Sequence, residues 1–485
     1  MSRKKKNPGS LLEPEARGGS VASDGFAFQE AVTLAYLPIW WAHEGFSSLI
    51  REAIGDTEAK FFVPGQGFVI ELLELKNHTL TPTEFWREIQ RFQELEEAAP
   101  GTYRRFILAC TGLSEALHPL YHSLQRIRGP QDFYPSTSAI PQRSWDDYVT
   151  VVKGLNHTGQ DAKFLFEKVD FHPDFSASPS HWEALFTRAL VKHRPGMQDI
   201  SGRSLHTLYE RLSMLLRDRC NQPILRREVE ACIDVAIPLE QRPAVMPVYI
   251  TTRADPAQPT EPTDLIFDWG DFFGGTERSY PVPEEWNERL LRDLTETCAW
   301  IVEQRRPRRI RLRGTRRLSA ALAIGSVFSA VAGFAVEVEY RGSLWASDNY
   351  PRDDDDVYSI EKEFLDGEGD QLIVTLAIPR PIASDVHAAL PSLSLEGAPQ
   401  LNLYGSRPIT SPQQANAAVG LIKREIATAL TRAHCQRIHL FCAVPSFVAL
   451  FLGHRLNATA TVQCYEYLAP MTYVRTICLG CELSY

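Results

Sequence analysis

The sequence predicts an α/β protein with two domains, and two observations lead to this fold class. In the second half, an internal repeat without gaps aligns residues 309–325 with residues 437–453. Each copy follows a long amphipathic helix, at residues 285–304 and 412–432, and precedes a further strand, at residues 335–340 and 461–467. In the first half, a helix, a β-hairpin, a helix, a strand and a helix follow one another. Strands that alternate with helices in this way are typical of mainly parallel sheets covered by helices.

The composition is that of a globular protein with a real core. The 485 residues suffice for two or three domains, and 44% of them are hydrophobic and 23% charged. The formal net charge of −9 argues against a basic nucleic-acid-binding surface over the whole molecule. Local basic stretches can still bind phosphate, so the net charge does not exclude a DNA substrate.

The cysteines and the apolar stretches bear on the compartment. Nine scattered cysteines include a single Cys-x-x-Cys pair, Cys478 and Cys481, which is a poor zinc signal without a second pair. No secretion signal and no apolar stretch of about 18 residues are present. We therefore expect a soluble protein of the reducing cytoplasm that does not associate with a membrane.

The first domain begins after a charged tail, residues 1–20, which we expect to be flexible. A helix is predicted from Gly25 onward. A β-hairpin follows, with strands at residues 59–64 and 68–76 joined by a Gly-Gln-Gly turn.

The hairpin is followed by a second helix over residues 83–97, with Thr83 as its N-cap. A buried strand is predicted at residues 104–110, and a helix near residues 113–124.

The rest of the first domain is mostly helical, and proline-rich stretches at residues 237–247 and 254–262 place a domain boundary near residue 240. The predicted domains are residues 21–240 and 241–485, the second containing two repeats at about 260–350 and 370–485.

The end of the hairpin carries the chemistry of the first domain. Glu74 and Lys76 are two apart on a strand, so they share one face, with Leu75 buried behind them. An acidic residue of the neighbouring strand, Asp56 as first choice and Glu58 as second, would complete a site for Mg²⁺ or Mn²⁺. The metal and the lysine suit phosphodiester cleavage. The alternative is that the alternating residues are only the solvent-facing side of a strand.

The same segment resembles a known nuclease core. The order helix, acidic strand, Glu-x-Lys strand, helix with Gln90 and Gln93, then strand is similar to restriction-endonuclease-like domains. The opening Gly25-Phe-Ala-Phe-Gln29 also resembles the Gly-x-x-Phe/Tyr-Gln start of nuclease domains fused to bacterial SAVED sensors. The resemblance implies that Gln29 lies near the metal and that Glu74 and Lys76 form the later motif, with Glu where many relatives have Gln.

Ligand-binding loops are predicted at the carboxyl ends of strands in the second domain, because open α/β sheets bind ligands there. Four loops qualify, at residues 268–278, 314–317, 404–407 and 444–446. They combine small residues with arginines that suit phosphate. Aromatic rings near strand ends could stack on bases. The candidate ligand-binding residues are Arg278, Thr315, Arg316, Trp345, Arg407, Pro445, Ser446 and Tyr465.

Each of these features also has a purely structural interpretation. Tyr465 and Trp345 could pack inside the protein. The arginine-rich residues 305–317 could be a solvated edge, a ligand contact or a contact between protomers. The acidic residues 353–356 lack the spacing of a calcium loop, so we expect a solvated loop there.

The repeated half, roughly residues 240–485, resembles the SAVED domain, a fused pair of CARF-like units. The residues that carry this resemblance are 437–453 and the following Val462-Gln-Cys-Tyr-Glu-Tyr467. The implied fold is a restriction-endonuclease-like α/β/α nuclease followed by two CARF-like, Rossmann-like units.

The implied function is that of an effector in CBASS antiphage defence. A cyclic di- or trinucleotide would bind the sensor and drive self-association, and the nuclease domains would then cut double-stranded DNA. The alternative is a nucleotide-binding scaffold without nuclease activity.

Overall fold

The computed structural model describes residues 14–129, 133–134, 138–175, 178–255, 260–274, 279–352, 358–456 and 460–480, with side chains from Gly25 onward. The chain divides into two compact units. One comprises Met1–Phe62 and Phe68–Ala244, and the other Val63–Gly67 and Val245–Tyr485. Among the described residues, no helix combines the length and apolarity needed to cross a membrane.

The first unit is built on a six-stranded sheet with the order β5-β4-β3-β2-β1-β6. β1 and β2 pair antiparallel, whereas β3, β4 and β5 run parallel to one another. The strands are β1 (Phe46–Arg51), β2 (Thr57–Val63), β3 (Gly67–Leu80), β4 (Tyr103–Leu113), β5 (Val169–His172) and β6 (Ile224–Leu225).

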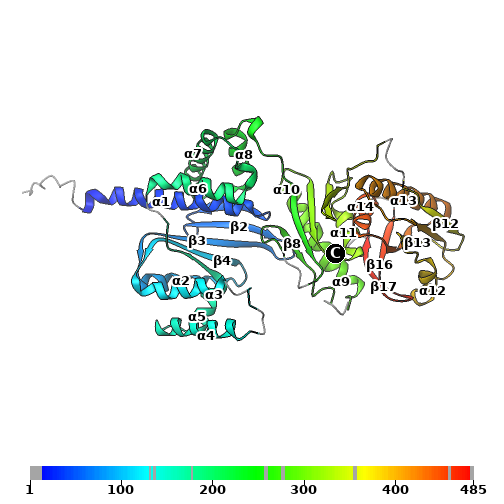
Figure 1. Cartoon of the computed structure of the whole chain (residues 1–485), viewed down its shortest axis with the longest axis horizontal. Helices are drawn as coiled ribbons and strands as arrows, with labels where there is room; N and C mark the ends of the chain where they lie inside the picture. Colours follow the sequence, from blue (N-terminus) through cyan, green and yellow to red (C-terminus); the bar gives the residue numbers. More distant parts are fainter. Residues whose placement is uncertain are drawn as a thin grey trace, which may run out of the picture. The chain divides into compact units, whose positions relative to one another are not determined.

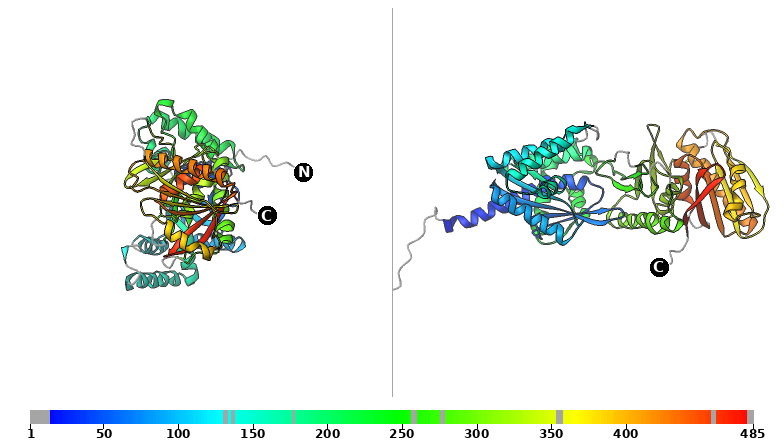
Figure 2. Two further views of the ribbon diagram at one scale, coloured as in Figure 1. Left: turned by 90° about the vertical axis from the view of Figure 1, so that its right-hand side faces the viewer. Right: turned by 90° about the horizontal axis from the view of Figure 1, so that it is seen from below.

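Helices cover both faces of this sheet (Figure 1). One layer contains α1 (Pro14–Ala42), α6 (Pro179–His193), α7 (Gly202–Asp218) and α8 (Arg226–Ala236). The opposite layer contains α2 (Pro82–Ala98), α3 (His118–Arg128), α4 (Ala139–Gly154) and α5 (Gly159–Lys168). The left-hand view of Figure 2 keeps α4 and α5, in cyan, at the opposite end of this unit from α7 and α8, in green.

Two helix starts differ from the prediction. Helix α1 begins at Pro14, inside the stretch that we expected to be a flexible tail. Helix α2 is capped by Thr81 instead of Thr83: the Thr81 side chain accepts from the backbone N–H of Glu84, and Glu84 bonds back to Thr81. This reciprocal capping box with Pro82 in the first turn is a stronger start signal than a lone threonine two residues later.

The second unit contains two sheets that are mainly parallel, as predicted. A five-stranded sheet has the order β11-β10-β9-β7-β8, and a six-stranded sheet has the order β12-β14-β13-β15-β16-β17. Of the described strand pairs in these two sheets, β10–β11, β12–β14 and β16–β17 are antiparallel and the others are parallel.

The first of these sheets comprises β7 (Val248–Arg253), β8 (Leu265–Asp268), β9 (Arg309–Gly314), β10 (Ala335–Tyr340) and β11 (Ser343–Ala346). The second comprises β12 (Glu361–Leu365), β13 (Gln371–Ala377), β14 (Gln400–Tyr404), β15 (Arg437–Ala443), β16 (Thr461–Ala469) and β17 (Thr472–Leu479). The helices of this unit are α9 (Pro283–Glu285), α10 (Arg292–Gln304), α11 (Leu318–Val327), α12 (Ala383–Leu393), α13 (Pro412–Ala433) and α14 (Ser446–Arg455).

The two copies of the sequence repeat form equivalent elements. The first copy contains β9 and α11, and the second contains β15 and α14. Helices α11 and α14 pack directly on each other through the matched glycines of the repeat. A Cβ atom on Gly325 would overlap the carbonyl oxygen of Leu450, and one on Gly453 would overlap that of Leu322. The repeat therefore conserves a close backbone contact between its two copies.

One predicted helix is interrupted. The amphipathic stretch at residues 285–304 forms α9, a π-helical segment at Trp286–Leu291, and then α10. Trp286 and Leu290 are both buried, and their spacing of four is also that of a regular helix, so the apolar pattern gives no signal of the wider turn.

Candidate functional site

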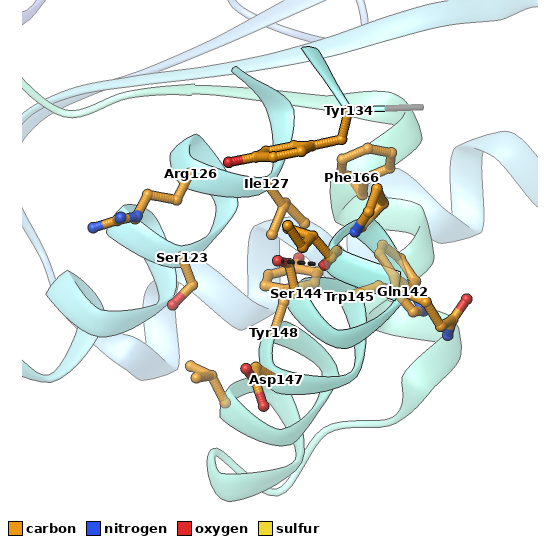
Figure 3. A pocket seen from close by; sticks show the side chains of 13 residues that line it. Ser123, Arg126, Ile127, Tyr134, Gln142, Ser144, Trp145, Asp147, Tyr148 and Phe166 are labelled. Carbon is orange, nitrogen blue, oxygen red and sulfur yellow. Dashed lines mark hydrogen bonds between the residues drawn. The ribbon is translucent and has the colours of Figure 1, made fainter. Parts of the chain in front are cut away.

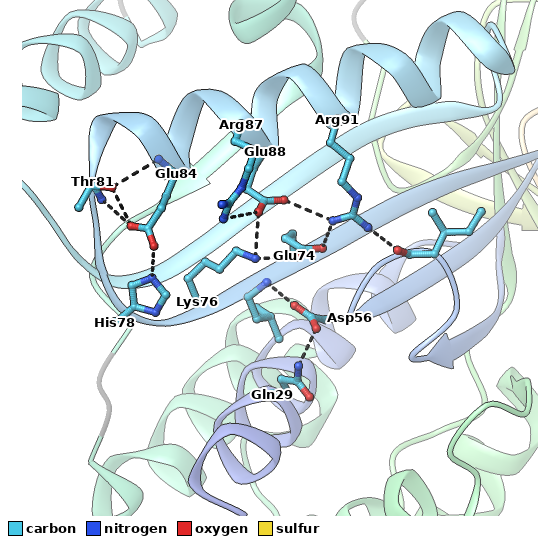
Figure 4. A network of polar contacts seen from close by, with 12 residues as sticks. Gln29, Asp56, Glu74, Lys76, His78, Thr81, Glu84, Arg87, Glu88 and Arg91 are labelled. Atoms are coloured by element: carbon cyan, nitrogen blue, oxygen red, sulfur yellow. Dashed lines mark hydrogen bonds and ion pairs between the residues drawn. The ribbon is translucent and has the colours of Figure 1, made fainter. Parts of the chain in front are cut away.

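The polar cluster of the first unit forms where β2 and β3 lie side by side (Figure 4). Asp56 stands directly before β2, and its two carboxylate oxygens accept hydrogen bonds from different elements. The Leu75 N–H of β3 donates to Oδ2 at 2.6 Å, and Nε2 of Gln29 in α1 donates to Oδ1 at 2.6 Å. Glu74 and Lys76 flank Leu75 on β3. The structure thus brings together all four predicted residues of this site.

Glu74 and Lys76 belong to a closed ring of alternating charges. The ammonium nitrogen of Lys76 is 2.9 Å from Glu74 Oε1 and 3.1 Å from Glu88 Oε1. A guanidinium nitrogen of Arg91 is 2.8 Å from Glu74 Oε2 and 3.3 Å from Glu88 Oε2. Two carboxylates therefore share two cations, and each carboxylate uses both of its oxygens. We call these four residues the charge ring.

The sequence predicts only two residues of the charge ring, Glu74 and Lys76. The other two, Glu88 and Arg91, come from α2 and were not predicted. Glu88 is buried and lies between Phe85, Ile89 and Phe92 on the face of α2 that packs on the sheet. A carboxylate in an otherwise apolar helical stripe is unusual, and this anomaly was the available signal. Gln90 and Gln93 do not face the cluster, since they bond to Glu94 and Asp161.

The second-choice acid, Glu58, has a structural role. Its Oε1 accepts from the backbone N–H groups of Ile54 and Gly55, at 2.8 and 3.2 Å. The geometry therefore favours Asp56 over Glu58 as the acidic partner of Glu74.

The pKa values of Asp56 and Lys76 are both raised above their usual values. Burial and the neighbouring Glu74 carboxylate raise the pKa of Asp56 to about 6, against the opposing effects of the Leu75 N–H, Lys76 and Arg91. Burial acts to lower the pKa of Lys76, but the contacts with Glu74 and Glu88 outweigh it and raise the pKa above its usual value. Two carboxylates that repel each other favour binding of a cation between them.

The donor set fits a magnesium-type cation. Asp56 and Glu74 supply carboxylate oxygens, and Oε1 of Gln29 is buried without a hydrogen-bond partner among the described residues. No cluster of three or more His, Cys, Asp or Glu side chains with metal-ligating geometry occurs in the described part of the chain. Mg²⁺ keeps several waters and is commonly held by one or two carboxylates, so this pair and the unpaired amide oxygen suffice.

The second unit places its predicted loops at the carboxyl ends of β8, β9, β14 and β15. Two of them converge. The N–H of Ser319, at the start of α11, donates to Glu466 near the end of β16 at 2.7 Å. The ring of Phe447, at the start of α14, packs on Tyr340 at the end of β10 with centroids 4.8 Å apart. Each helix start thus contacts a strand end of the other repeat, and loops 314–317 and 444–446 lie on the same side.

Two neighbouring cationic side chains lie in the first of these loops. Arg316 is half-buried, and its one described hydrogen bond is to Thr252 Oγ1 at 3.4 Å. Burial lowers the pKa of Arg316 to about 10. Nε of its neighbour Arg317 is buried without a hydrogen-bond partner among the described residues. Two such guanidinium groups are well suited to an anionic ligand.

The other loop candidates vary in their surroundings. Thr315 is exposed and its hydroxyl accepts from Ala254 N–H at 3.4 Å. Pro445 is the N-cap of α14, and its side chain makes no capping hydrogen bond, so the first backbone N–H groups of the helix, including that of Ser446, have no side-chain cap from this residue. Arg407 is exposed and lies over the Tyr358 ring, 5.7 Å from its centroid.

Two predicted base-stacking residues are buried instead. Tyr465 is 3% exposed and stacks on Phe441 with ring centroids 4.1 Å apart, and its hydroxyl contacts His439 Nδ1 at 2.7 Å. Trp345 is 4% exposed and packs on Tyr340 and Phe447. Neither ring has a free face for a base, because Trp345 packs on Phe447 of α14 and Tyr465 lies in a core cluster with residues of α12.

Three further predictions have different outcomes. Arg278 and residues 353–356 lie outside the described residues. The arginine-rich strand β9 is largely neutralised: Arg309 and Arg311 both pair with Glu337, at 2.8 and 2.7 Å. These paired arginines favour a structural role over ligand binding.

A cavity of about 530 Å³ opens between α3 and α4 in the first unit (Figure 3). Aromatic and polar side chains line it, including Arg126, Tyr134, Trp145, Asp147 and Phe166. It shares no residue with the charge ring or with Asp56 and Gln29, so it is separate from the polar cluster.

Comparison with known proteins identifies the second unit. Residues 291–479 match the family model of the SMODS-associated and fused to various effectors sensor domain. They form a SAVED domain. The match includes both copies of the sequence repeat and loops 314–317 and 444–446, and it begins after strands β7 and β8 of the unit.

Curated relatives align over nearly the whole chain. CD-NTase-associated protein 4 of Moraxella osloensis is 29% identical over 460 residues, which cover 95% of this chain and 97% of that protein. The protein of the same name from an Acinetobacter species is 28% identical over 461 residues, with the same coverage.

Solved structures agree in fold. The Acinetobacter baumannii Cap4 SAVED/CARF-domain containing receptor with the cyclic trinucleotide 2′3′3′-cAAA aligns with a TM-score of 0.81 and 26% identity, covering 93% of this chain and 98% of that chain. The Moraxella osloensis Cap4 receptor aligns with a TM-score of 0.78 and 27% identity, covering 94% of this chain and 99% of that chain. The predicted α/β fold with a C-terminal SAVED domain is confirmed.

Proposed function

We propose that this protein is a metal-dependent endonuclease that cuts double-stranded DNA when a cyclic oligonucleotide binds its SAVED domain. It would act in this way as an effector of CBASS antiphage defence. The observation that carries the nuclease assignment is the convergence of four residues from α1, the start of β2 and β3: Gln29, Asp56, Glu74 and Lys76. The sequence similarity over both units to Cap4 proteins supports the combination of the two activities.

The chain's own residues have distinct tasks in this proposal. Asp56 and Glu74 hold Mg²⁺ or Mn²⁺, and Gln29 supports Asp56 through its amide N–H. When bound, the metal supplies a Lewis acid and a water of lowered pKa. The Lys76 ammonium, two residues from Glu74 on the same strand face, offsets negative charge on the phosphate that is cut.

The SAVED domain would bind the phosphates of the ligand between loops 314–317 and 444–446. Arg316 and Arg317 supply cationic groups, and the start of α14 supplies backbone N–H groups. We propose a cyclic di- or trinucleotide as the ligand because the similar Acinetobacter baumannii receptor binds cyclic trinucleotides. Self-association on ligand binding would bring nuclease units together on DNA.

Cleavage of plasmid DNA with Mg²⁺ tests the proposal, with and without a panel of cyclic di- and trinucleotides. We expect fragmentation of the plasmid only with one ligand of the panel. Lys76→Met should abolish cutting while leaving ligand binding unchanged. Lys153→Met, which changes an exposed lysine of α4, should cut like the wild type.

The alternative is a nucleotide-binding scaffold. Ligand binding without any DNA cleavage, in the wild type and under all metal conditions, would favour it and would make the charge ring a purely structural feature.

A further inference from the structure

Glu88 is a buried carboxylate on an otherwise apolar helix face, and burying its charge costs free energy. It is 5% exposed and lies on the packed face of α2. A buried carboxylate is tolerated only when cations or hydrogen-bond donors compensate its charge. Both of its oxygens are used inside the charge ring, one by Lys76 and the other by Arg91.

The charge ring creates a problem for Glu74, and Glu88 resolves it. Glu74 is needed by the proposed metal, yet both of its oxygens already contact cations, Lys76 at 2.9 Å and Arg91 at 2.8 Å. If Glu74 were their sole anionic partner, these cations would compete directly with the metal. Glu88 gives each of them a second anion on α2, so the cations stay in place when Glu74 turns an oxygen toward the metal.

We propose that Glu88 is a positioning residue that, together with Arg91, holds the Lys76 ammonium at the reacting phosphate while Glu74 engages the metal. This inference rests on the proposed nuclease function and extends it to two residues outside the Glu-x-Lys motif. Arg91 anchors the arrangement from the other side, because its guanidinium also donates to the carbonyl oxygen of Ile54, just before Asp56.

The test compares Glu88→Gln with a matched change on the same helix. Glu94→Gln removes an exposed carboxylate that bonds to Gln90 and should leave cutting unchanged. Glu88→Gln keeps the side-chain shape and removes the charge. We expect its kcat for plasmid cleavage to fall about 10- to 100-fold, the usual effect of losing an outer partner of a metal site. KM for DNA should stay the same.

Two further variants separate positioning from other roles. Glu88→Asp keeps the charge and should recover part of the lost kcat. In a Lys76→Met background, Glu88→Gln should cause no additional loss, because its effect passes through the lysine. Calorimetric titration with Mn²⁺ gives a readout besides activity: Glu74→Gln should lose binding, whereas Glu88→Gln should weaken it by less than about tenfold.

Several results would overturn the inference. Equal kcat values for Glu88→Gln and Glu94→Gln would show that Glu88 does not serve the reaction. A loss of Mn²⁺ affinity as large as that of Glu74→Gln would make Glu88 a metal ligand instead. A further loss of cutting in the Lys76→Met background would show that Glu88 acts independently of the lysine. If the wild type cuts no DNA with any ligand of the panel, the proposed function itself fails, and the inference falls with it.

Discussion

The carboxylates of Asp56 and Glu74 lie close together. Burial and the repulsion from Glu74 raise the pKa of Asp56 to about 6. A metal binds the ionised form, so protons compete with the metal below this pH. We expect Mn²⁺ affinity to rise about fivefold between pH 5 and pH 6 and about twofold more by pH 7, and then to level off. Calorimetry of the full chain at several pH values measures this. An affinity that does not change from pH 5 to pH 7 would contradict the role of Asp56.

The sequence alone predicts Asp56, Glu74 and Lys76 but not the other half of the charge ring, for a physical reason. The two-residue period of a strand places Glu74 and Lys76 on one face, and a hairpin brings an acid from the neighbouring strand beside them. Glu88 and Arg91 could not be placed in the same way. Their contact with Lys76 depends on how α2 is rotated on the sheet, which the sequence pattern of the helix does not fix to within a single residue.

Burial could not be predicted for the aromatic residues of the SAVED domain either. Trp345 and Tyr465 stand near strand ends, where rings are equally suited to stacking on a base or filling a core. The packing of α14 on β10 and the Phe441 ring decide in favour of the core, and neither contact is visible in the local sequence.

At the level of elements, the start of α2 offers a paired test. Thr81→Ala removes the hydroxyl that accepts from Glu84 N–H and should lower the free energy of unfolding by about 1 kcal/mol. Thr83→Ala changes an exposed threonine within the first turn and should have an effect below about 0.5 kcal/mol. Thermal unfolding of the two variants in parallel measures both. A larger loss of stability in Thr83→Ala than in Thr81→Ala would show that Thr83 is the N-cap, as the sequence predicts.

The contact between α11 and α14 gives a second test. A methyl group at Gly325 would overlap the Leu450 carbonyl, so Gly325→Ala should force the helices apart and cost about 3 kcal/mol. Gly420→Ala is the matched control, because this glycine of α13 has open space around its Cα. Since alanine favours a helix, the control should gain about 0.5 kcal/mol or more.

Scanning calorimetry distinguishes these two glycine variants. Equal melting temperatures would mean that the α11–α14 contact accommodates an added methyl group without loss of stability.

Regular elements followed the sequence more closely than interrupted ones. Strand β10 and the starts of α13 and β15 begin at the predicted residues, because turn residues mark their ends and apolar periodicity marks their interiors. The π-helical segment at Trp286–Leu291 could not be predicted, since its buried residues, Trp286 and Leu290, keep the spacing of an ordinary helix.

At the scale of the whole molecule, the two candidate sites lie on units with separate sheets and cores. We therefore expect their binding functions to be separable. Arg316→Gln should weaken binding of the active cyclic oligonucleotide about tenfold or more, the effect of losing a charge-assisted contact, with Mn²⁺ affinity unchanged. Glu74→Gln should show the reverse. Arg424→Gln, an exposed arginine of α13, serves as the control.

Calorimetric titrations of each variant with ligand and with Mn²⁺ give the result. Loss of ligand binding in Glu74→Gln, or of Mn²⁺ binding in Arg316→Gln, would mean that the two sites are not independent.

The paired glycines of α11 and α14 have a consequence for how a signal crosses the SAVED domain. Where side chains separate two helices, a small displacement is absorbed by changes of rotamer. Here the main chain of one repeat contacts the main chain of the other at Gly325 and Gly453, so no change of side-chain rotamer can absorb a displacement. A ligand that displaces loop 314–317 must therefore move α11 and α14 together, so that both repeats change position as one rigid body.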